Sequence, residues 1–315
     1  MKWMLDLKFE QPNRLIHHSE PILLMGSCFT GNIGAALEKR LFQTVINPCG
    51  IIFDPDSLAR HVHRAIQGIE IDKSSLILYN ERYQSLQFHS DFSALQLDEA
   101  VQKMNASMQV LRQGLKNSKH LIITLGSSFA YRYKETGQLV ANCHQFPADY
   151  FEKVLLKADE ITDLLQQMIE EIRAFNPEIN MLFTVSPVRH ARDGVVANNR
   201  SKAQLIEAIH RLCEENEECA YFPAYEWVID VLRDYRWYDL DLVHPNYAAT
   251  DSVFEQFCAI CLDDWTQEQL KDLHQLSLAM EHRPRFPETE AHRKFLAAMK
   301  LKRVDILQRM PWIKA

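Results

Sequence analysis

The sequence is poor in glycine, with nine among 315 residues, so each glycine marks a place where the backbone has a reason to turn tightly. It has no apolar run of the length of a membrane span. It also has no long basic block, and its net charge is −7. Because phosphate binding needs clustered lysine and arginine, these features argue against nucleic-acid binding. We therefore expect neither nucleic-acid nor membrane partners.

Features of secretion are also missing. Asp6 and Glu10 interrupt the apolar residues of the amino-terminal segment, which is therefore a poor signal peptide, and we expect a cytoplasmic protein. The seven cysteines are odd in number and scattered, unlike a disulfide framework. Cys258 and Cys261 form a C-x-x-C inside an apolar helical pattern with no second Cys or His pair nearby. We interpret them as a buried helix face rather than a zinc or redox site.

What the sequence does contain is an alternation of strand and helix patterns. Short, nearly continuous apolar runs are typical of strands in a parallel sheet that is covered on both faces. Helical periodicity lies between them, for example at Leu205, Ile209 and Leu212. This alternation predicts a doubly wound α/β layer fold. The five predicted strands are Ile22–Met25, Thr44–Ile46, Leu121–Leu125, Met181–Val185 and Ala220–Phe222.

The domain organisation follows from changes in this pattern. Residues 1–262 are predicted to form the α/β domain, and 70–100 fit it poorly, as an insertion of loops and short strands. Residues 263–315 are predicted to form a helical extension that packs on the domain or mediates homo-oligomerisation. Thr266 and Gln269 have capping-box spacing at its start.

Candidate functional residues follow the predicted strands, because ligands of open parallel sheets bind at the carboxyl ends of the strands. Three glycines stand there, Gly26, Gly50 and Gly126, and glycine leaves backbone N–H groups uncovered, as an oxyanion hole requires. Two adjacent nucleophile candidates, Ser27 and Cys28, come after the first strand. At the start of a helix, the dipole is expected to depress the pKa of a thiol.

Six ordered motifs carry a family resemblance over residues 21 to about 262. They are GSCF, NPCGIIFDP, TLGSSFAYR, VANCHQFP, TVSPVRHARDGVVANNRSKAQL and YRWYDLDLVHP. In these motifs the chain resembles the GSCFA family, which is similar to the SGNH, or GDSL-like, hydrolases. The resemblance implies a three-layer α/β/α, flavodoxin-like fold and cleavage of esters. We expect neither a cofactor nor a metal.

The four sequence blocks of SGNH enzymes place roles on residues of this chain. Aligned without gaps on GDSIT, GSCFT puts Ser27 in the place of Asp and Cys28 in the place of the nucleophilic serine. Gly50 matches the glycine whose N–H helps to hold the oxyanion. Asp241 and His244 match the D-x-x-H block, in which the histidine is the base and the aspartate orients it.

The third block departs from the pattern, because Gly126-Ser127-Ser128 lacks the asparagine of G-x-N. Asn142 or the Ser128 hydroxyl are the alternatives for that oxyanion contact. Arg189 and His190 follow a predicted strand and are expected either to line the cleft or to make a structural salt bridge. His89 and His144 lie in loops that could cover the site, and nothing in their spacing indicates a metal.

These residues support two readings of function. The first is an acyl hydrolase (esterase or thioesterase) or acyltransferase, with a Cys/Ser-His-Asp arrangement acting on a small acylated substrate. The alternative is a non-catalytic protein that binds a small molecule or carbohydrate in the same cleft. Each candidate also has a structural reading: Cys28 as a small buried residue and Ser27 as a helix N-cap. A third hypothesis is an interaction module that works through the C-terminal helices.

Overall fold

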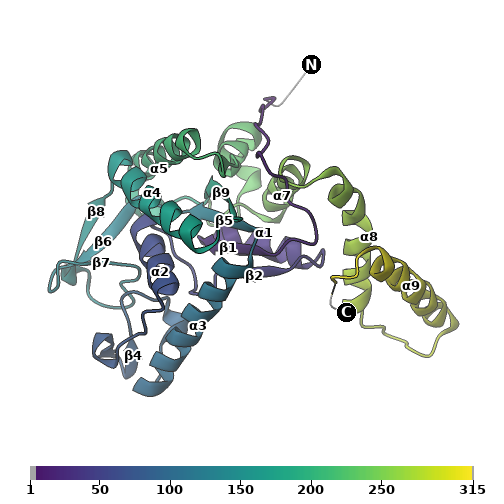
Figure 1. Ribbon diagram of the computed structural model, residues 1–315, viewed down its shortest axis with the longest axis horizontal. Coiled ribbons are helices and arrows are strands. Elements are labelled where there is room, and N and C mark those ends of the chain that lie inside the picture. Colours follow the sequence, from purple (N-terminus) through teal and green to yellow (C-terminus); the bar gives the residue numbers. More distant parts are fainter. Residues whose placement is uncertain (1–4, 314–315) are drawn as a thin grey trace.

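The computed structural model describes residues 5–313 and has a five-stranded parallel sheet at its centre (Figure 1). All five strands coincide with the predicted ones to within a residue or two at their ends. Residues on β1 alternate between the two faces of the sheet, with Leu23 and Met25 on one side and Ile22 and Leu24 on the other. The strands are β1 (Ile22–Gly26), β2 (Thr44–Ile46), β5 (His120–Leu125), β9 (Asn180–Val185) and β10 (Cys219–Tyr221).

The order of strands across the sheet is β10-β9-β5-β1-β2. If the five are counted in chain order, this is 2-1-3-4-5, one of the two common doubly wound arrangements. The strands β2 and β5 lie on opposite sides of β1, so the direction in which the chain proceeds across the sheet reverses between β1 and β5. The loops after β1 and β5 therefore run in opposite directions. In sheets of this class, ligands bind beside such a switch point, at the carboxyl ends of the strands.

Helices cover both faces of the sheet (Figure 1), as the alternating pattern predicted. One face packs on α2 (Pro55–Gln67), α3 (Leu97–Asn117), α4 (Ala158–Phe175) and α5 (Val195–Glu215). The other face packs on α1 (Cys28–Glu38), α7 (Tyr247–Cys261) and a π-helix at Trp227–Leu232, which follows α6 (Ala224–Glu226). Cys258 and Cys261 are buried in this second core, which confirms the interpretation of C-x-x-C as a helix face.

Two insertions meet beside this body. Residues 70–96 contain the antiparallel hairpin of β3 (Ile77–Tyr79) and β4 (Arg82–Gln84), while 129–155 form a separate antiparallel sheet that the sequence analysis missed. The two share a small apolar cluster that includes Leu86 and Phe151, and we call them together the accessory lobe. The second sheet consists of β6 (Phe129–Tyr133), β7 (Leu139–Val140) and β8 (Phe151–Leu155).

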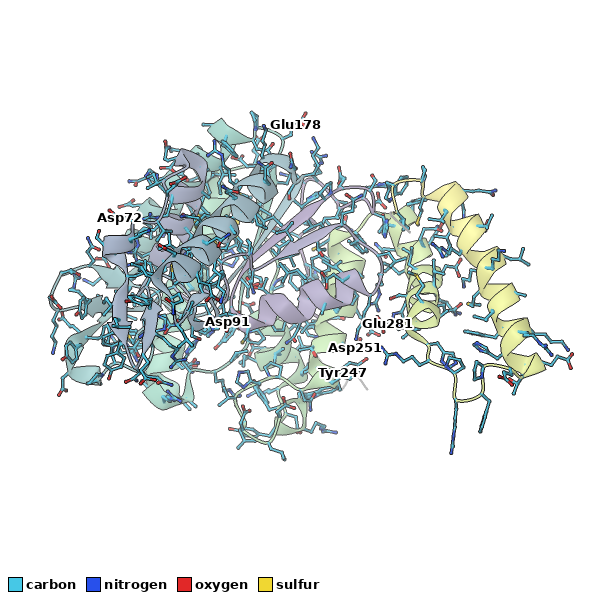
Figure 2. All side chains as sticks on the ribbon, turned by 90° about the horizontal axis from the view of Figure 1, so that it is seen from below. Asp72, Asp91, Glu178, Tyr247, Asp251 and Glu281 are labelled. Atoms are coloured by element: carbon cyan, nitrogen blue, oxygen red, sulfur yellow. The ribbon has the colours of Figure 1, made fainter. Side chains whose placement is uncertain are left out.

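The C-terminal region is helical, as predicted. Figure 2 shows α8 (Asp264–Glu281) and α9 (Glu290–Arg309) standing out from the α/β body, with Glu281 labelled at the end of α8. The expected capping box is wrong, because Asp263 caps α8 and accepts the Thr266 N–H at 2.7 Å. Within residues 5–313, the short 3-10 helices are Lys73–Ser75, Ser90–Phe92, Ala148–Tyr150, Ala191–Asp193 and Tyr235–Trp237.

None of the helices within residues 5–313 combines the length and the apolar character needed to cross a membrane.

Candidate functional site

The turn after β1 is shaped by its glycine. Gly26 has φ of +133°, and a Cβ at this position would lie 2.1 Å from the carbonyl oxygen of Thr124 on the neighbouring β5. Only glycine fits so close an approach of two strands. The Asn47 side chain accepts the Gly26 N–H at 2.9 Å and fastens the turn to the end of β2.

Ser27 and Cys28 have different environments at this turn. The Ser27 hydroxyl is the N-cap of α1, accepting the Phe29 N–H at 3.3 Å, and the residue is only 1% exposed. The structural reading of Ser27 is therefore confirmed. Cys28 is the first residue of α1 and is partly exposed, so it is the member of the pair that solvent can reach.

The expectation of a depressed thiol pKa at Cys28 is wrong. Burial disfavours the thiolate and raises the pKa above its usual value. The N–H groups of Phe29 and Cys28 at the start of the helix lower it, as does the charge of Lys202, but these contributions are smaller. The helix terminus therefore acts in the expected direction and is outweighed by desolvation.

The turn after β5 contains a buried group of serines. The Ser201 hydroxyl, from α5, accepts the Ser128 N–H at 2.8 Å and lies 3.1 Å from the Ser127 hydroxyl. Ser128 is fully buried, and its hydroxyl donates to Ser201 at 3.2 Å. In this structure the Ser128 hydroxyl is committed to the interior rather than open to a bound ligand.

Lys202 is the residue of this edge that sequence reasoning missed. The residue is 1% exposed, and its ammonium group donates to the carbonyls of Gly126 at 2.6 Å and Ser186 at 2.7 Å, which follow β5 and β9. The sequence pattern could have indicated its burial. Asn198, Ser201 and Lys202 lie seven, four and three residues before Leu205, and helical spacing therefore places them on the same buried face of α5. All three are buried.

Asp241 and His244 form a close pair. Asp241 Oδ2 lies 2.6 Å from His244 Nδ1, and Asp241 Oδ1 accepts the His244 N–H at 3.0 Å. These hydrogen bonds lower the pKa of the Asp241 carboxyl to about 2, so it is ionised at neutral pH. An ionised carboxylate at Nδ1 favours the tautomer with the proton on Nδ1 and leaves Nε2 as an acceptor. Each side chain is 49% exposed.

The segment after β9 ties this pair to the carboxyl edge. The Arg189 N–H donates to the Val243 carbonyl at 3.2 Å, and the guanidinium donates to Leu242 at 3.4 Å and stacks on Tyr238 at 4.1 Å. The ring of His190 meets Phe53 edge-on at 5.8 Å between centroids. Arg189 thus packs against the D-x-x-H loop through hydrogen bonds and ring stacking.

Phe53 connects that segment to the turns after β1 and β5. Its carbonyl accepts the N–H groups of Gly126 at 2.9 Å and Ser127 at 3.1 Å. A Cβ added to Gly126 would lie 3.1 Å from the Phe53 ring and 3.4 Å from Ser27 Cβ. A continuous series of contacts therefore runs from the turn bearing Cys28 to the loop bearing His244.

Gly50 and Asn142 lie toward the accessory lobe. The Gly50 N–H, expected as an oxyanion donor, instead donates to the Asn47 carbonyl at 2.8 Å within a turn. A Cβ on Gly50, whose φ is +78°, would lie 2.5 Å from His89 Cβ, so the glycine permits the lobe to pack closely there. Asn142 accepts the His144 N–H at 2.7 Å, an interaction within the lobe.

Within the described part of the chain, no three His, Cys, Asp or Glu side chains are grouped closely enough to hold a metal ion. The chemical groups of the carboxyl edge are thus a thiol, an imidazole–carboxylate pair, a buried ammonium and buried hydroxyls. A thiol and an imidazole are the groups used for nucleophilic acyl transfer.

Comparison with known proteins identifies the family. The family model named GSCFA family matches residues 21–257, and a second model, named GSCFA domain protein, C-terminal domain, matches residues 273–314. A search among curated proteins found no match. The first match covers the sheet, every candidate site residue and the helices that flank the sheet, up to the last turn of α7. The second match covers the second half of α8 and all of α9. The chain therefore belongs to the GSCFA family.

Proposed function

We propose that this protein is an SGNH-like acyl hydrolase or acyltransferase, acting on an ester or thioester of a small molecule, with Cys28 as its nucleophile. The observation that carries the proposal is the Asp241–His244 hydrogen bond of 2.6 Å, on a loop packed against the carboxyl edge that bears Cys28. The strand order 2-1-3-4-5 is the flavodoxin-like order that the proposed three-layer fold requires.

The proposed reaction uses these groups in two steps. His244 Nε2 takes the proton of the Cys28 thiol, and Asp241 stabilises the imidazolium that forms. The thiolate attacks the acyl carbon to form a thioester, and the imidazolium returns the proton to the departing alcohol or thiol. Water, or an acceptor hydroxyl, then attacks the thioester with His244 again as base, which restores the thiol and releases the acyl group.

The test is turnover of short-chain aryl esters and thioesters by the wild type, Cys28→Ala and His244→Ala. We expect Cys28→Ala to abolish turnover and His244→Ala to lower kcat/KM by about 100-fold or more, the usual contribution of a general base. His63→Ala is the matched control. His63 pairs with the carboxylate of Glu171 at 2.9 Å, between α2 and α4, and its removal should leave kcat/KM unchanged.

The proposal fails if the purified wild type turns over no ester or thioester and His244→Ala leaves the alkylation rate of Cys28 unchanged. That result would favour a second function, a non-catalytic binding protein that keeps the cleft. The raised thiol pKa of Cys28 and the occupied N–H of Gly50 are the observations on its side. Stabilisation of the protein against heat by small acylated molecules or sugars, without turnover, would support it.

A further inference from the structure

The two C-terminal helices bury little of their surface. Figure 2 shows α8 and α9 side by side, away from the α/β body, and we call this pair the arm. Ile306 is the single buried side chain of α9 within the described residues. In proteins, most of the stability of a helix comes from packing of its apolar face, and a pair of helices this small has little interior of its own. The arm therefore has surface for a partner.

Large apolar side chains are exposed on both helices of the arm. Leu301 of α9, for example, is 73% exposed. Single exposed apolar residues are normal on a protein surface, but a gathering of them marks an interaction surface. From residue 278 onwards, the two helices expose Leu278, Met280, Phe295, Leu296, Leu301 and Val304.

The two helices also have opposite charge. α8 contains four acidic residues and one basic residue, whereas α9 contains six basic and two acidic residues. The chain already uses this complementarity within the arm, where Asp272 of α8 pairs with Lys302 of α9 at 2.8 Å. Other charges of the arm are exposed and make no ion pair among residues 5–313, including Glu268, Glu281, Lys300 and Arg303.

We propose that the arm is the interface of a symmetric dimer, in which two arms pack into a four-helix bundle with α9 of each copy against α8 of the other. Two helical hairpins joined in this way bury apolar surface that neither hairpin buries alone. A two-fold axis makes the contact self-complementary, because α9 of the first copy meets α8 of the second and α8 of the first meets α9 of the second.

The charges favour a second copy over other occupants of this surface. A contact of α9 with α9 would bring like charges together, whereas a contact of α9 with α8 brings basic residues to acidic ones. A nucleic acid or an anionic lipid surface would attract α9 but would repel the acidic helix beside it. A second copy presents both signs of charge, each opposite its complement.

The first experiment reverses the exposed charges of one helix at a time. By size-exclusion chromatography with light scattering, the wild type should have twice the mass of one chain. Lys300→Glu with Arg303→Glu in α9, and Glu268→Lys with Glu281→Lys in α8, should each give monomers, because each pair of changes puts like charges across the interface. An equimolar mixture of the two variants should restore the dimer, since a reversed α9 then faces a reversed α8.

The second experiment tests the apolar part of the interface. Leu301→Ser should raise the dissociation constant of the dimer about tenfold or more, because the dimer would bury this side chain. Leu95→Ser is the matched control, at a leucine of the accessory lobe that is 66% exposed, and should leave the dissociation constant unchanged. Sedimentation equilibrium measures both constants, and circular dichroism checks that every variant is folded.

A wild type that stays monomeric from low to high micromolar concentration would overturn the inference. A dimer that both charge-reversed variants retain, that their mixture does not restore, or that Leu301→Ser does not weaken would do the same. Co-sedimentation of a monomeric wild type with vesicles of anionic phospholipid would assign the arm to a lipid surface instead. None of these measurements uses ester turnover, so their outcome is independent of the proposed function.

Discussion

At the scale of single residues, the structure separates two neighbours that look equivalent in the sequence. Ser27 faces inward because the turn directs its hydroxyl to the first free N–H groups of α1, as a helix N-cap requires. Cys28, one residue later, has already entered the helix and is partly exposed. Local capping chemistry thus assigns Ser27 a structural role and leaves Cys28 as the candidate nucleophile.

The same turn makes Gly26 critical for stability. Gly26→Ala should lower the free energy of unfolding by about 3 kcal/mol or more, because the new Cβ meets the Thr124 carbonyl and the backbone has a positive φ. Gly31→Ala, in the middle of α1 with nothing within 4 Å, is the control and should raise the free energy by roughly 0.5–1 kcal/mol. Urea unfolding measures the free energy of unfolding of both variants. Equal changes in the two variants would contradict this account of the Gly26 turn.

At the scale of elements, helix starts bring polar groups to the carboxyl edge. The first turns of α5 supply Ser201 and Lys202, and α2 begins just after Phe53 with Asp54 as its N-cap. Asp54 accepts the Ser57 N–H at 2.8 Å and is 4% exposed. Burial raises the pKa of its carboxyl to about 6 from a usual value of 3.8. The cap is therefore well placed but costly to ionise.

This cap predicts a pH dependence of stability. Because the pKa of Asp54 is higher in the folded state, folding favours the protonated carboxyl. The resulting contribution to the free energy of unfolding is complete below about pH 4 and is lost as pH rises through about 6. Asp54→Asn keeps the cap without the charge. At pH 7 it should be more stable than the wild type by up to about 3 kcal/mol, and less so towards pH 4.

Urea unfolding at several pH values checks the expectation for Asp54. Asp263→Asn, at the partly exposed cap of α8, is the control for replacing a capping aspartate by asparagine. Parallel pH profiles for Asp54→Asn and the wild type would contradict this account of the buried cap.

At the scale of the whole molecule, the α8–α9 region meets the α/β body near the start of α8, where Thr266 accepts the His18 N–H at 2.9 Å. Its own cluster joins Leu273 and Leu276 of α8 to Ile306 of α9. The chain then returns to the body at Trp312, whose indole N–H donates to His18 Nδ1 at 3.0 Å. His18 is buried and its pKa is lowered by that burial, which keeps the ring neutral and Nδ1 free to accept.

Trp312 should therefore decide whether the C-terminal helices dock. In Trp312→Ala, loss of the indole packing and of its hydrogen bond should weaken docking by roughly 2 kcal/mol, so amide exchange in α9 should accelerate while exchange in the sheet stays the same. Phe286→Ala, at a side chain 65% exposed between α8 and α9, is the control and should change neither. Hydrogen exchange with mass spectrometry measures both; unaltered exchange in α9 of Trp312→Ala would contradict this account.

The sequence by itself determined the sheet and the place of the candidate site. Strand runs such as Ile22–Met25 and helical faces such as that of Leu205 are local patterns, and parallel strands necessarily present their carboxyl ends at one edge. That edge brings Cys28, Gly126 and Arg189 into one region. The Asp241–His244 pair could also be predicted from the sequence, because two residues only three positions apart in the chain lie close together in space.

Only the tertiary structure decided how those groups behave. The pKa of Cys28 depends on how much solvent its neighbours exclude, and the space around Gly50 depends on where His89 of the accessory lobe packs. The sheet of 129–155 escaped notice because short antiparallel strands on the surface carry little apolar periodicity. Lys202 shows the reason most clearly. A lysine in a helix is read as exposed, and burial is a property of what packs around it, which no local pattern contains.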